Sequence, residues 1–374
     1  MVDKKGADGL PTPDHTASGK EHFETLDGLR GSAALLVVLF HIQGITVGFA
    51  QGKLLLSHAY LAVDFFFALS GFVIGYAYDD RWSRMTIKRF FGIRLVRLHP
   101  LVVLGVLLGL LSYLFDPFAA DRQNAALPLL ALATAMNLLL LPTVTLPGRW
   151  TDTHPLNGPS WTLFQEYIAN IAYALLLRRL STRTLGVLAV IAGGVLLACA
   201  LSIGTLDRGY AWENLWMAPV RLAFPFITGL WLYRVKDRLP RWRLGFLPLS
   251  IVLTVAFALP TWPALGGFKM NGLYEALVVL LLFPAIVVAG AHSSGGRSMM
   301  RLCKVSGDLS YPLYITHFPL MFVWTNYLMS YKAEPASALP IAVALVPVTL
   351  ALAWAAFTFW DVPIRRTLTS RLRR

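Results

Sequence analysis

The sequence has little charge and almost no cysteine. Only 14% of its 374 residues are Asp, Glu, Lys or Arg, and 56% are hydrophobic. Soluble domains carry about 25% charged residues, so this composition excludes an ordinary soluble domain and indicates a polytopic membrane protein. The two cysteines, Cys199 in an apolar run and Cys303 in a basic loop, do not indicate a disulfide framework.

Several motifs are also missing. The sequence has no glycine-rich phosphate loop, no Ser-His-Asp arrangement typical of a soluble hydrolase and no cluster of metal ligands. It shows no internal repeat, which disfavours a transporter built from inverted halves. No short apolar core with a cleavage site opens the chain, so we expect the first span to be an uncleaved start-transfer helix. Residues 1–24 are mostly polar and predict a disordered cytoplasmic tail.

The net charge of +13 does not indicate nucleic-acid binding, because Lys and Arg are grouped in short clusters between apolar runs. This distribution is typical of the positive-inside rule. The densest cluster comprises Arg81, Arg84, Lys88, Arg89, Arg94 and Arg97. It predicts a cytoplasmic loop, and therefore cytoplasmic termini, with a basic cytoplasmic tail over residues 367–374.

About ten runs approach the roughly 20 residues that a membrane-spanning helix needs. They cover residues 29–49, 58–78, 98–115, 160–177, 185–203, 215–233, 244–259, 272–291, 309–328 and 339–360. The run Leu127–Leu141 is shorter and contains Asn137. If it crossed the membrane, every later basic loop would lie outside, so we expect a re-entrant or interfacial segment. The predicted fold is an all-α transmembrane bundle.

Ionisable residues inside these runs are candidate functional groups, because burying them in hydrocarbon requires a partner or a water-filled cavity. Arg30 and His41 are eleven residues apart in the first run, which on a helix is roughly 16 Å along nearly one face. Asp64 lies near the outer end of the second run. Since a short link joins the two runs, we expect Asp64 to lie beside His41 and orient it. The alternative is that Asp64 pins a loop at the interface.

Two further stretches place polar groups in the membrane. PSWTLFQEYIAN contains Trp161 and Glu166, and we expect this acid in the outer half of its span; Trp161 could equally be an interfacial indole. SGDLSYPLYITHFPL contains Ser310, Tyr311 and His317, and that histidine should reach mid-membrane. One such histidine could be a packing residue. Two histidines at mid-depth together with two acids favour function.

Two arginines enter the third span from the predicted cytoplasmic loop. Arg94 and Arg97 lie one helical turn apart, and a topological anchor would explain either one. Together with Arg30 at the same depth, they could instead form a phosphate-binding site.

Five motifs together resemble the acyltransferase 3 family of integral-membrane acyltransferases. They are LDGLRGSAALLVVLFH at 26–41, VDFFFALSGF at 63–72, RLVRLHP at 94–100, PSWTLFQEY at 159–167 and GDLSYPLYITHFPL at 307–320. They occur in the family's order and cover nearly the whole chain from residue 26. The departures are small. Ala62 stands where glycine is usual, and Thr162 and Gln165 replace commoner serines.

The resemblance implies an acyltransferase 3 transmembrane domain over residues 25–366 in a bacterial inner membrane. It implies an enzyme that moves an acyl group, acetyl by default, from cytoplasmic acyl-CoA to a hydroxyl of a cell-surface or lipid-linked glycan, without a metal. Some members carry a fused periplasmic domain. This sequence ends at Arg374 without one, so we expect direct transfer or transfer to a separate protein.

The resemblance also suggests roles for the candidate residues. His41 would be the general base, because the family's pattern is an arginine followed eleven residues later by histidine. Asp64 would orient His41, and Glu166 and His317 would position the acceptor or stabilise the developing charge. The CoA phosphates would be bound by Arg30, Arg94 and Arg97. The remaining substrate contacts would come from Trp161, Ser310 and Tyr311. The competing interpretation is a secondary transporter that uses the same groups as a relay. A non-enzymatic scaffold for polysaccharide export is weaker, because it leaves the buried ionisable groups unexplained.

Overall fold

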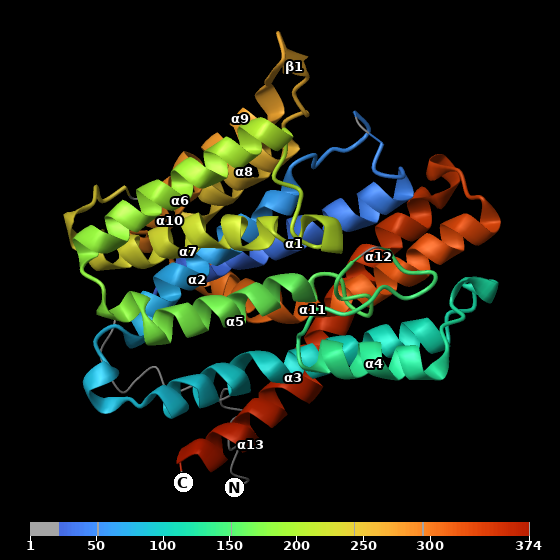
Figure 1. Ribbon diagram of the computed structural model, residues 1–374, viewed down its shortest axis with the longest axis horizontal. Coiled ribbons are helices and arrows are strands. Elements are labelled where there is room, and N and C mark those ends of the chain that lie inside the picture. Colours follow the sequence, from blue (N-terminus) through green and yellow to red (C-terminus); the bar gives the residue numbers. More distant parts are fainter. Residues whose placement is uncertain (1–21, 51, 151, 243, 294, 374) are drawn as a thin grey trace, which may run out of the picture.

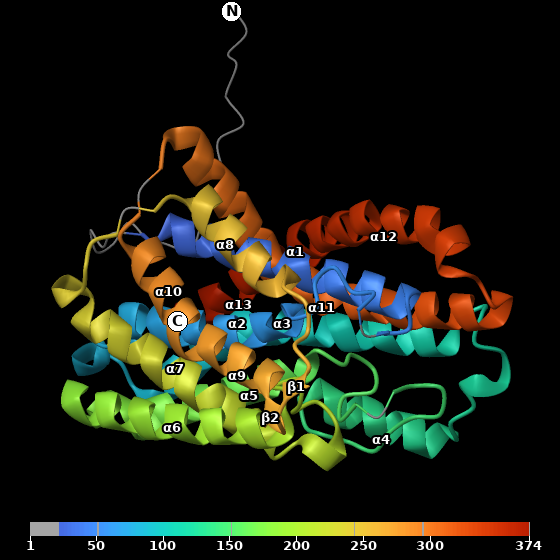
Figure 2. The same cartoon turned by 90° about the horizontal axis from the view of Figure 1, so that it is seen from above.

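The computed structural model describes residues 22–373 apart from 51, 151, 243 and 294, and its architecture is a helical bundle (Figures 1 and 2). The helices are α1 (Glu24–Thr46), α2 (Ala62–Tyr78), α3 (Ile87–Leu114), α4 (Leu127–Leu138), α5 (Ser160–Leu175), α6 (Thr182–Ile203), α7 (Met217–Val235), α8 (Phe246–Ala258), α9 (Met270–Leu277), α10 (Phe283–Ala291), α11 (Arg297–Tyr331), α12 (Pro335–Ala355) and α13 (Val362–Arg373). In the described part of the chain the named strands are the antiparallel pair β1 (Ala264–Leu265) and β2 (Phe268–Lys269). The predicted all-α class is confirmed.

Each predicted span falls on a helix. Six helical segments of the described chain are long and apolar enough to cross a membrane, at 24–46, 59–78, 87–114, 182–203, 270–291 and 335–372. The other predicted spans are helical as α5, α7, α8 and α11, but these are too short or too polar to meet the same criterion. The chain is therefore a multi-pass membrane protein.

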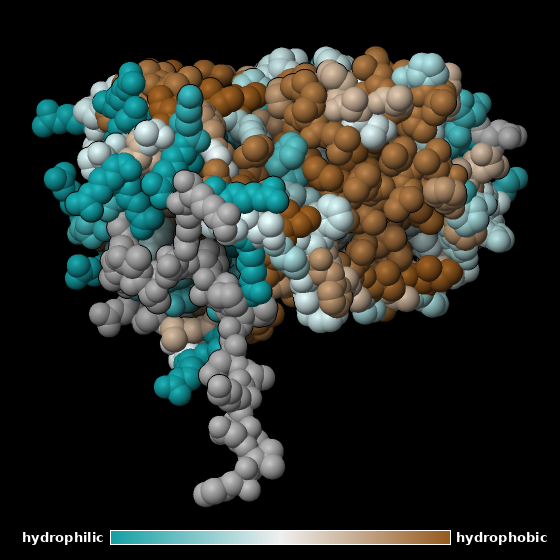
Figure 3. Space-filling model, turned by 90° about the horizontal axis from the view of Figure 1, so that it is seen from below, coloured by the Kyte–Doolittle hydropathy of each residue, from teal (hydrophilic) through white to brown (hydrophobic). Residues whose placement is uncertain are grey.

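The helices separate into a buried centre and an exposed periphery. α1 packs along α11, and α2 packs along α7. In α1 and α2 about two thirds or more of the apolar window is buried (67% and 72%), whereas in α6 and in the segment from α12 to α13 the figure is 22%. On one face of the molecule, Figure 3 shows apolar side chains over one end and hydrophilic side chains gathered at the other. The peripheral helices thus present apolar surface to lipid.

Glycines allow the two central helix pairs to approach closely. A Cβ atom at Gly31 on α1 would overlap Ser306 on α11, and one at Gly71 on α2 would overlap the backbone of Phe226 on α7. Small residues at helix contacts let backbones pack together in membrane proteins. The register of α1 against α11, which positions the candidate site, depends on this contact.

The short apolar run predicted as re-entrant or interfacial forms α4, a helix of twelve residues beside α3. An irregular loop follows and leads back to α5, and its residues Thr153, His154 and Leu156 are fully buried. Irregular backbone is tolerated in such proteins where protein covers it. The re-entrant or interfacial placement of this segment stays a prediction.

The predicted tails fall partly outside the described residues. Residues 1–21 and 374 lie outside them, and α1 already begins at Glu24. The predicted basic tail is helical as far as Arg373, as the end of α13.

Candidate functional site

The two histidines predicted at mid-depth lie against each other. Nδ1 of His41 on α1 is 3.1 Å from Nε2 of His317 on α11, and the rings stack with centroids 5.1 Å apart. His317 is fully buried, whereas His41 is partly exposed. The close packing of α1 and α11 therefore creates an imidazole pair from residues 276 positions apart.

The hydrogen bonds of this pair fix its tautomers. Nδ1 of His317 lies 3.1 Å from the carbonyl oxygen of Leu313, which can only accept, so this nitrogen carries the proton. Nε2 of His317 must then accept from Nδ1–H of His41. The His41 ring also hydrogen-bonds to the backbone of Val37, and since its single proton is on Nδ1, Nε2 of His41 is left with its lone pair. A neutral imidazole with a free lone pair can take a proton from a hydroxyl group.

Aromatic rings enclose the pair. Phe40 and Phe318 both contact His41 edge-on, with ring centroids 5.3 and 5.2 Å away, and Tyr314 lies 6.1 Å from His317. These rings restrict how a substrate and water can reach the imidazoles.

The expected contact between Asp64 and His41 is wrong. Both carboxylate oxygens of Asp64 accept from Arg221 on α7, with Oδ2 2.5 Å from Nη2 and Oδ1 3.2 Å from Nε. Asp64 and Arg221 are 0% and 1% exposed. α2 packs more extensively on α7 than on α1, and a guanidinium satisfies a buried carboxylate better than a neutral imidazole does. His317 takes the position expected of Asp64.

The three candidate phosphate-binding arginines come together. Arg30 and Arg94 both lie close enough to Arg97 for their charges to repel, with Glu166 also within electrostatic range. No described residue forms a hydrogen bond or ion pair with the Arg97 guanidinium. A partly exposed arginine among like charges is available to an anionic ligand.

The other two arginines are held by protein groups. Nη2 of Arg94 is 2.5 Å from a carboxylate oxygen of Glu166, which also accepts from Ser70 at 3.0 Å. Glu166 was expected in the outer half of the bundle, yet it pairs with Arg94, which was expected at the inner face. Arg30 donates through Nε to Ser310 Oγ at 2.9 Å and ion-pairs with Asp27.

The candidate substrate-binding residues already contact other protein groups. Ser310 is buried and also donates to the Gly307 carbonyl at 2.6 Å. Tyr311 Oη donates to the Leu98 carbonyl at 2.6 Å, which ties α11 to α3. Trp161 is 6% exposed, with the Arg221 guanidinium 5.5 Å from its ring centroid. These contacts favour the structural alternative for Trp161.

Several buried charges were not predicted from the sequence, and two of them hold links between helices. Besides Arg221 on α7, Glu275 on α9 is fully buried and accepts from Tyr60 Oη at 2.5 Å and from the Leu206 backbone at 2.5 Å. Both residues stand as single charges inside apolar runs, which is the signal that could have identified them. Their hydrogen bonds hold in place the links that precede α2 and α7.

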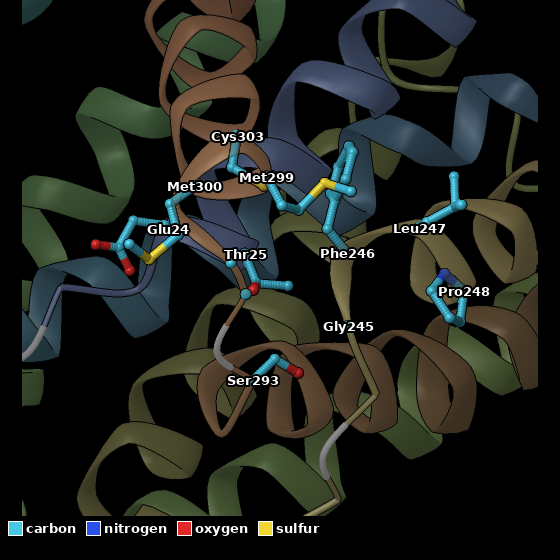
Figure 4. A pocket seen from close by; sticks show the side chains of 12 residues that line it. Glu24, Thr25, Gly245, Phe246, Leu247, Pro248, Ser293, Met299, Met300 and Cys303 are labelled. Carbon is cyan, nitrogen blue, oxygen red and sulfur yellow. The ribbon is translucent and has the colours of Figure 1, made fainter.

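Cavities lie at opposite ends of the bundle, and two of them are formed by described residues. The smaller, about 260 Å³, lies where α1, α8 and α11 begin, and Met299, Met300, Cys303 and Phe246 line much of it (Figure 4). It has no basic side chain, so it does not suit a phosphate group. The larger, about 590 Å³, lies at the end where α1 and α6 finish.

No group of three or more His, Cys, Asp or Glu side chains in the described chain could hold a metal ion.

The sequence matches a known family and resembles several known proteins. The profile of the family described as "Acyltransferase domain" matches residues 23–358. "Protein 2 in picA locus" of Rhizobium radiobacter is 38% identical over 169 residues, which are 42% of this chain and 83% of that protein. "Acyltransferase MdmB" of Streptomyces mycarofaciens is 26% identical over 93% of this chain and 92% of its own. "Peptidoglycan O-acetyltransferase OatA" of Listeria monocytogenes is 22% identical over 94% of this chain and 57% of its own length. No solved structure matches significantly.

Proposed function

The chain belongs to the acyltransferase 3 family, and on that premise we propose that it is an O-acyltransferase that moves an acyl group from cytoplasmic acyl-CoA to a hydroxyl of a cell-surface or lipid-linked glycan. Acetyl is the expected acyl group. The corresponding topology has about ten spans and both termini in the cytoplasm of a bacterium, with the bundle in the inner membrane.

The observation that carries this proposal is the free Nε2 of His41 behind its hydrogen bond to His317. Nε2 of His41 takes the proton of the acceptor hydroxyl as its oxygen attacks the thioester carbonyl. The tetrahedral intermediate then collapses, the carbon–sulfur bond breaks, and the His41 imidazolium returns its proton to the CoA thiolate. His317 accepts from Nδ1–H throughout, so it stabilises the imidazolium and holds the ring in place.

The basic cluster supplies the binding site for the donor. Arg97 contacts the CoA phosphates directly, while Arg30 and Arg94, held by their own partners, add positive potential. Glu166 orients Arg94 in this scheme. Arg30 and His41 lie on one helix with a rise of roughly 16 Å between them, which the pantetheine arm can span. The phosphates are therefore bound at one end of α1 while the thioester reaches His41.

The test is a transfer assay on membrane vesicles that contain the protein, with labelled acetyl-CoA and two readouts, the thiol released and the label found in glycan. We expect His41→Ala to lower both by at least about 10²-fold, the contribution of a general base. The matched control is His292→Ala, since His292 lies at the end of α10 and bonds only its own helix. Unchanged transfer in His41→Ala at equal protein level contradicts the proposal.

A further inference from the structure

The larger cavity lies at the end of the bundle opposite to the basic loops. Its walls come from the links between α1 and α2, between α6 and α7 and between α8 and α9. The basic clusters lie in the links at the other ends of these helices, for example between α2 and α3 and between α7 and α8. A ligand in this cavity therefore enters from the side opposite to acyl-CoA.

Two charged side chains in its wall are not hydrogen-bonded to any described residue. Asp207 and Arg208 both line the cavity and are partly exposed. In the part of the chain that the structure describes, neither the Asp207 carboxylate nor the Arg208 guanidinium makes a hydrogen bond or ion pair. Buried or half-buried charges are normally paired, so these two are available to a ligand.

The rest of the lining is aromatic and polar. Trp262 and Phe49, 42% and 42% exposed, present their rings, and Thr205 and Asn271 add hydrogen-bonding groups. The volume of about 590 Å³ falls within the range of small-molecule sites, roughly 300–1,000 Å³. The Asn271 amide is itself held by Gly204, Glu275 and the Trp262 backbone, so the free polar groups are the two charges. Aromatic faces beside free charged groups match a ring compound with an apolar face and many hydroxyl groups.

We propose that this cavity binds a sugar residue of the acceptor, which stacks on Trp262 and donates hydroxyl hydrogen bonds to Asp207. The assignment as acceptor rests on the proposed function. Burial raises the pKa of Asp207 to about 6, so its carboxylate is ionised and can accept hydrogen bonds at neutral pH.

Phe40 connects the cavity to the imidazole pair. Its ring lies at the cavity wall, 5.6 Å from the Phe49 ring and 5.9 Å from the Tyr60 ring, and 5.3 Å from the His41 ring. A sugar in the cavity is thus separated from His41 by one side chain. Movement of Phe40 admits a hydroxyl group to Nε2 of His41, and its bulk limits which hydroxyl reaches it.

The test measures occupancy of the cavity independently of acyl transfer. Cys199 and Cys303 are replaced by serine, and Thr261→Cys places a single thiol in the exposed wall of the cavity. The full-length protein in nanodiscs is alkylated with a water-soluble maleimide, with and without cellobiose or N,N′-diacetylchitobiose at millimolar concentration. Ser337→Cys, an exposed position at the start of α12, is the matched control thiol.

We expect at least one disaccharide to slow alkylation of Thr261→Cys several-fold and to leave Ser337→Cys unaffected. Adding Trp262→Ala or Asp207→Asn should remove this protection, whereas Trp354→Ala on the periphery should not. Equal alkylation rates with and without both disaccharides overturn the inference. Protection in a protein that transfers no acetyl group supports the sugar site and rejects the proposed function.

Discussion

The Nδ1 atom of His41 lies 3.1 Å from Nε2 of His317, so one imidazole holds the other in a single tautomer. The pair joins α1 to α11 inside the bundle, and the free nitrogen belongs to His41. Removing the acceptor nitrogen of His317 should therefore impair His41 without touching the substrates.

The first prediction concerns His317→Phe, which keeps a stacked ring and removes Nε2. We expect kcat for acetyl transfer to fall by roughly 10- to 100-fold, because His41 loses the partner that stabilises its imidazolium, while KM for acetyl-CoA stays the same. Steady-state kinetics on protein in nanodiscs separate the two parameters. A parallel rise in KM would assign His317 to donor binding.

The second prediction concerns the buried ion pair of Asp64 and Arg221. Asp64→Asn leaves the guanidinium buried without its counter-ion, which costs about 3–5 kcal/mol for such pairs. We expect a lower thermal midpoint in detergent and poor expression, and we expect the double variant Asp64→Leu with Arg221→Met to recover much of the loss. An Asp64→Asn protein with a normal midpoint and no activity would restore the orienting role first expected of Asp64.

The third prediction concerns Arg97, the cation left free among its neighbours. CoA should raise the thermal midpoint of the wild-type protein, because a ligand that binds only the folded state stabilises it. Arg97→Ala should weaken CoA binding by roughly 10- to 100-fold, the usual worth of a hydrogen bond to a charged group. Arg89→Ala, an exposed position on the same helix, is the matched control. If CoA has no effect on the wild-type midpoint, a transporter becomes the better interpretation.

Sequence patterns located the helices because hydropathy reports burial in lipid directly. Each expected span is a helix, and the spacing of Arg30 and His41 placed both on α1. The partners of polar groups were harder to predict, since they depend on which helices pack together. The short link between the first two runs suggested that Asp64 faces His41. However, α2 packs mainly on α7, where Arg221 forms an ion pair with Asp64.

The partner of Glu166 was also not predicted. Its position in the chain suggested the outer half, whereas its carboxylate pairs with Arg94 of the basic cluster. The imidazole pair joins two histidines for which the sequence predicted a similar depth. Their contact could not be inferred, because it depends on the close α1–α11 packing at Gly31.

The fourth prediction concerns Asp152 in the loop before α5. The carboxyl is 6% exposed, its Oδ2 has no hydrogen-bond partner in the described chain, and burial together with the charge of Asp207 raises its pKa to about 7. An ordinary Asp ionises near 3.8, so between about pH 4 and pH 7 the folded protein binds a proton that the unfolded chain releases. The free energy of unfolding therefore falls as the pH rises through this window, because the folded protein holds Asp152 in its protonated form. The total loss between about pH 4 and about pH 7 is a few kcal/mol.

Asp152→Asn removes that titration while keeping the shape of the neutral acid. We expect the thermal midpoint of the variant to exceed that of the wild-type protein by several degrees at about pH 8, with the difference shrinking toward about pH 4. Thermal unfolding in detergent across this range measures it. Asp237→Asn is the matched control, because this carboxyl is exposed and its pKa is lowered by its hydrogen bond to Lys236, so it gives no gain at high pH. The opposite result would be a wild-type thermal midpoint that rises relative to that of Asp152→Asn between about pH 5 and about pH 8. It would mean that the Asp152 carboxylate is ionised and hydrogen-bonded in the folded protein.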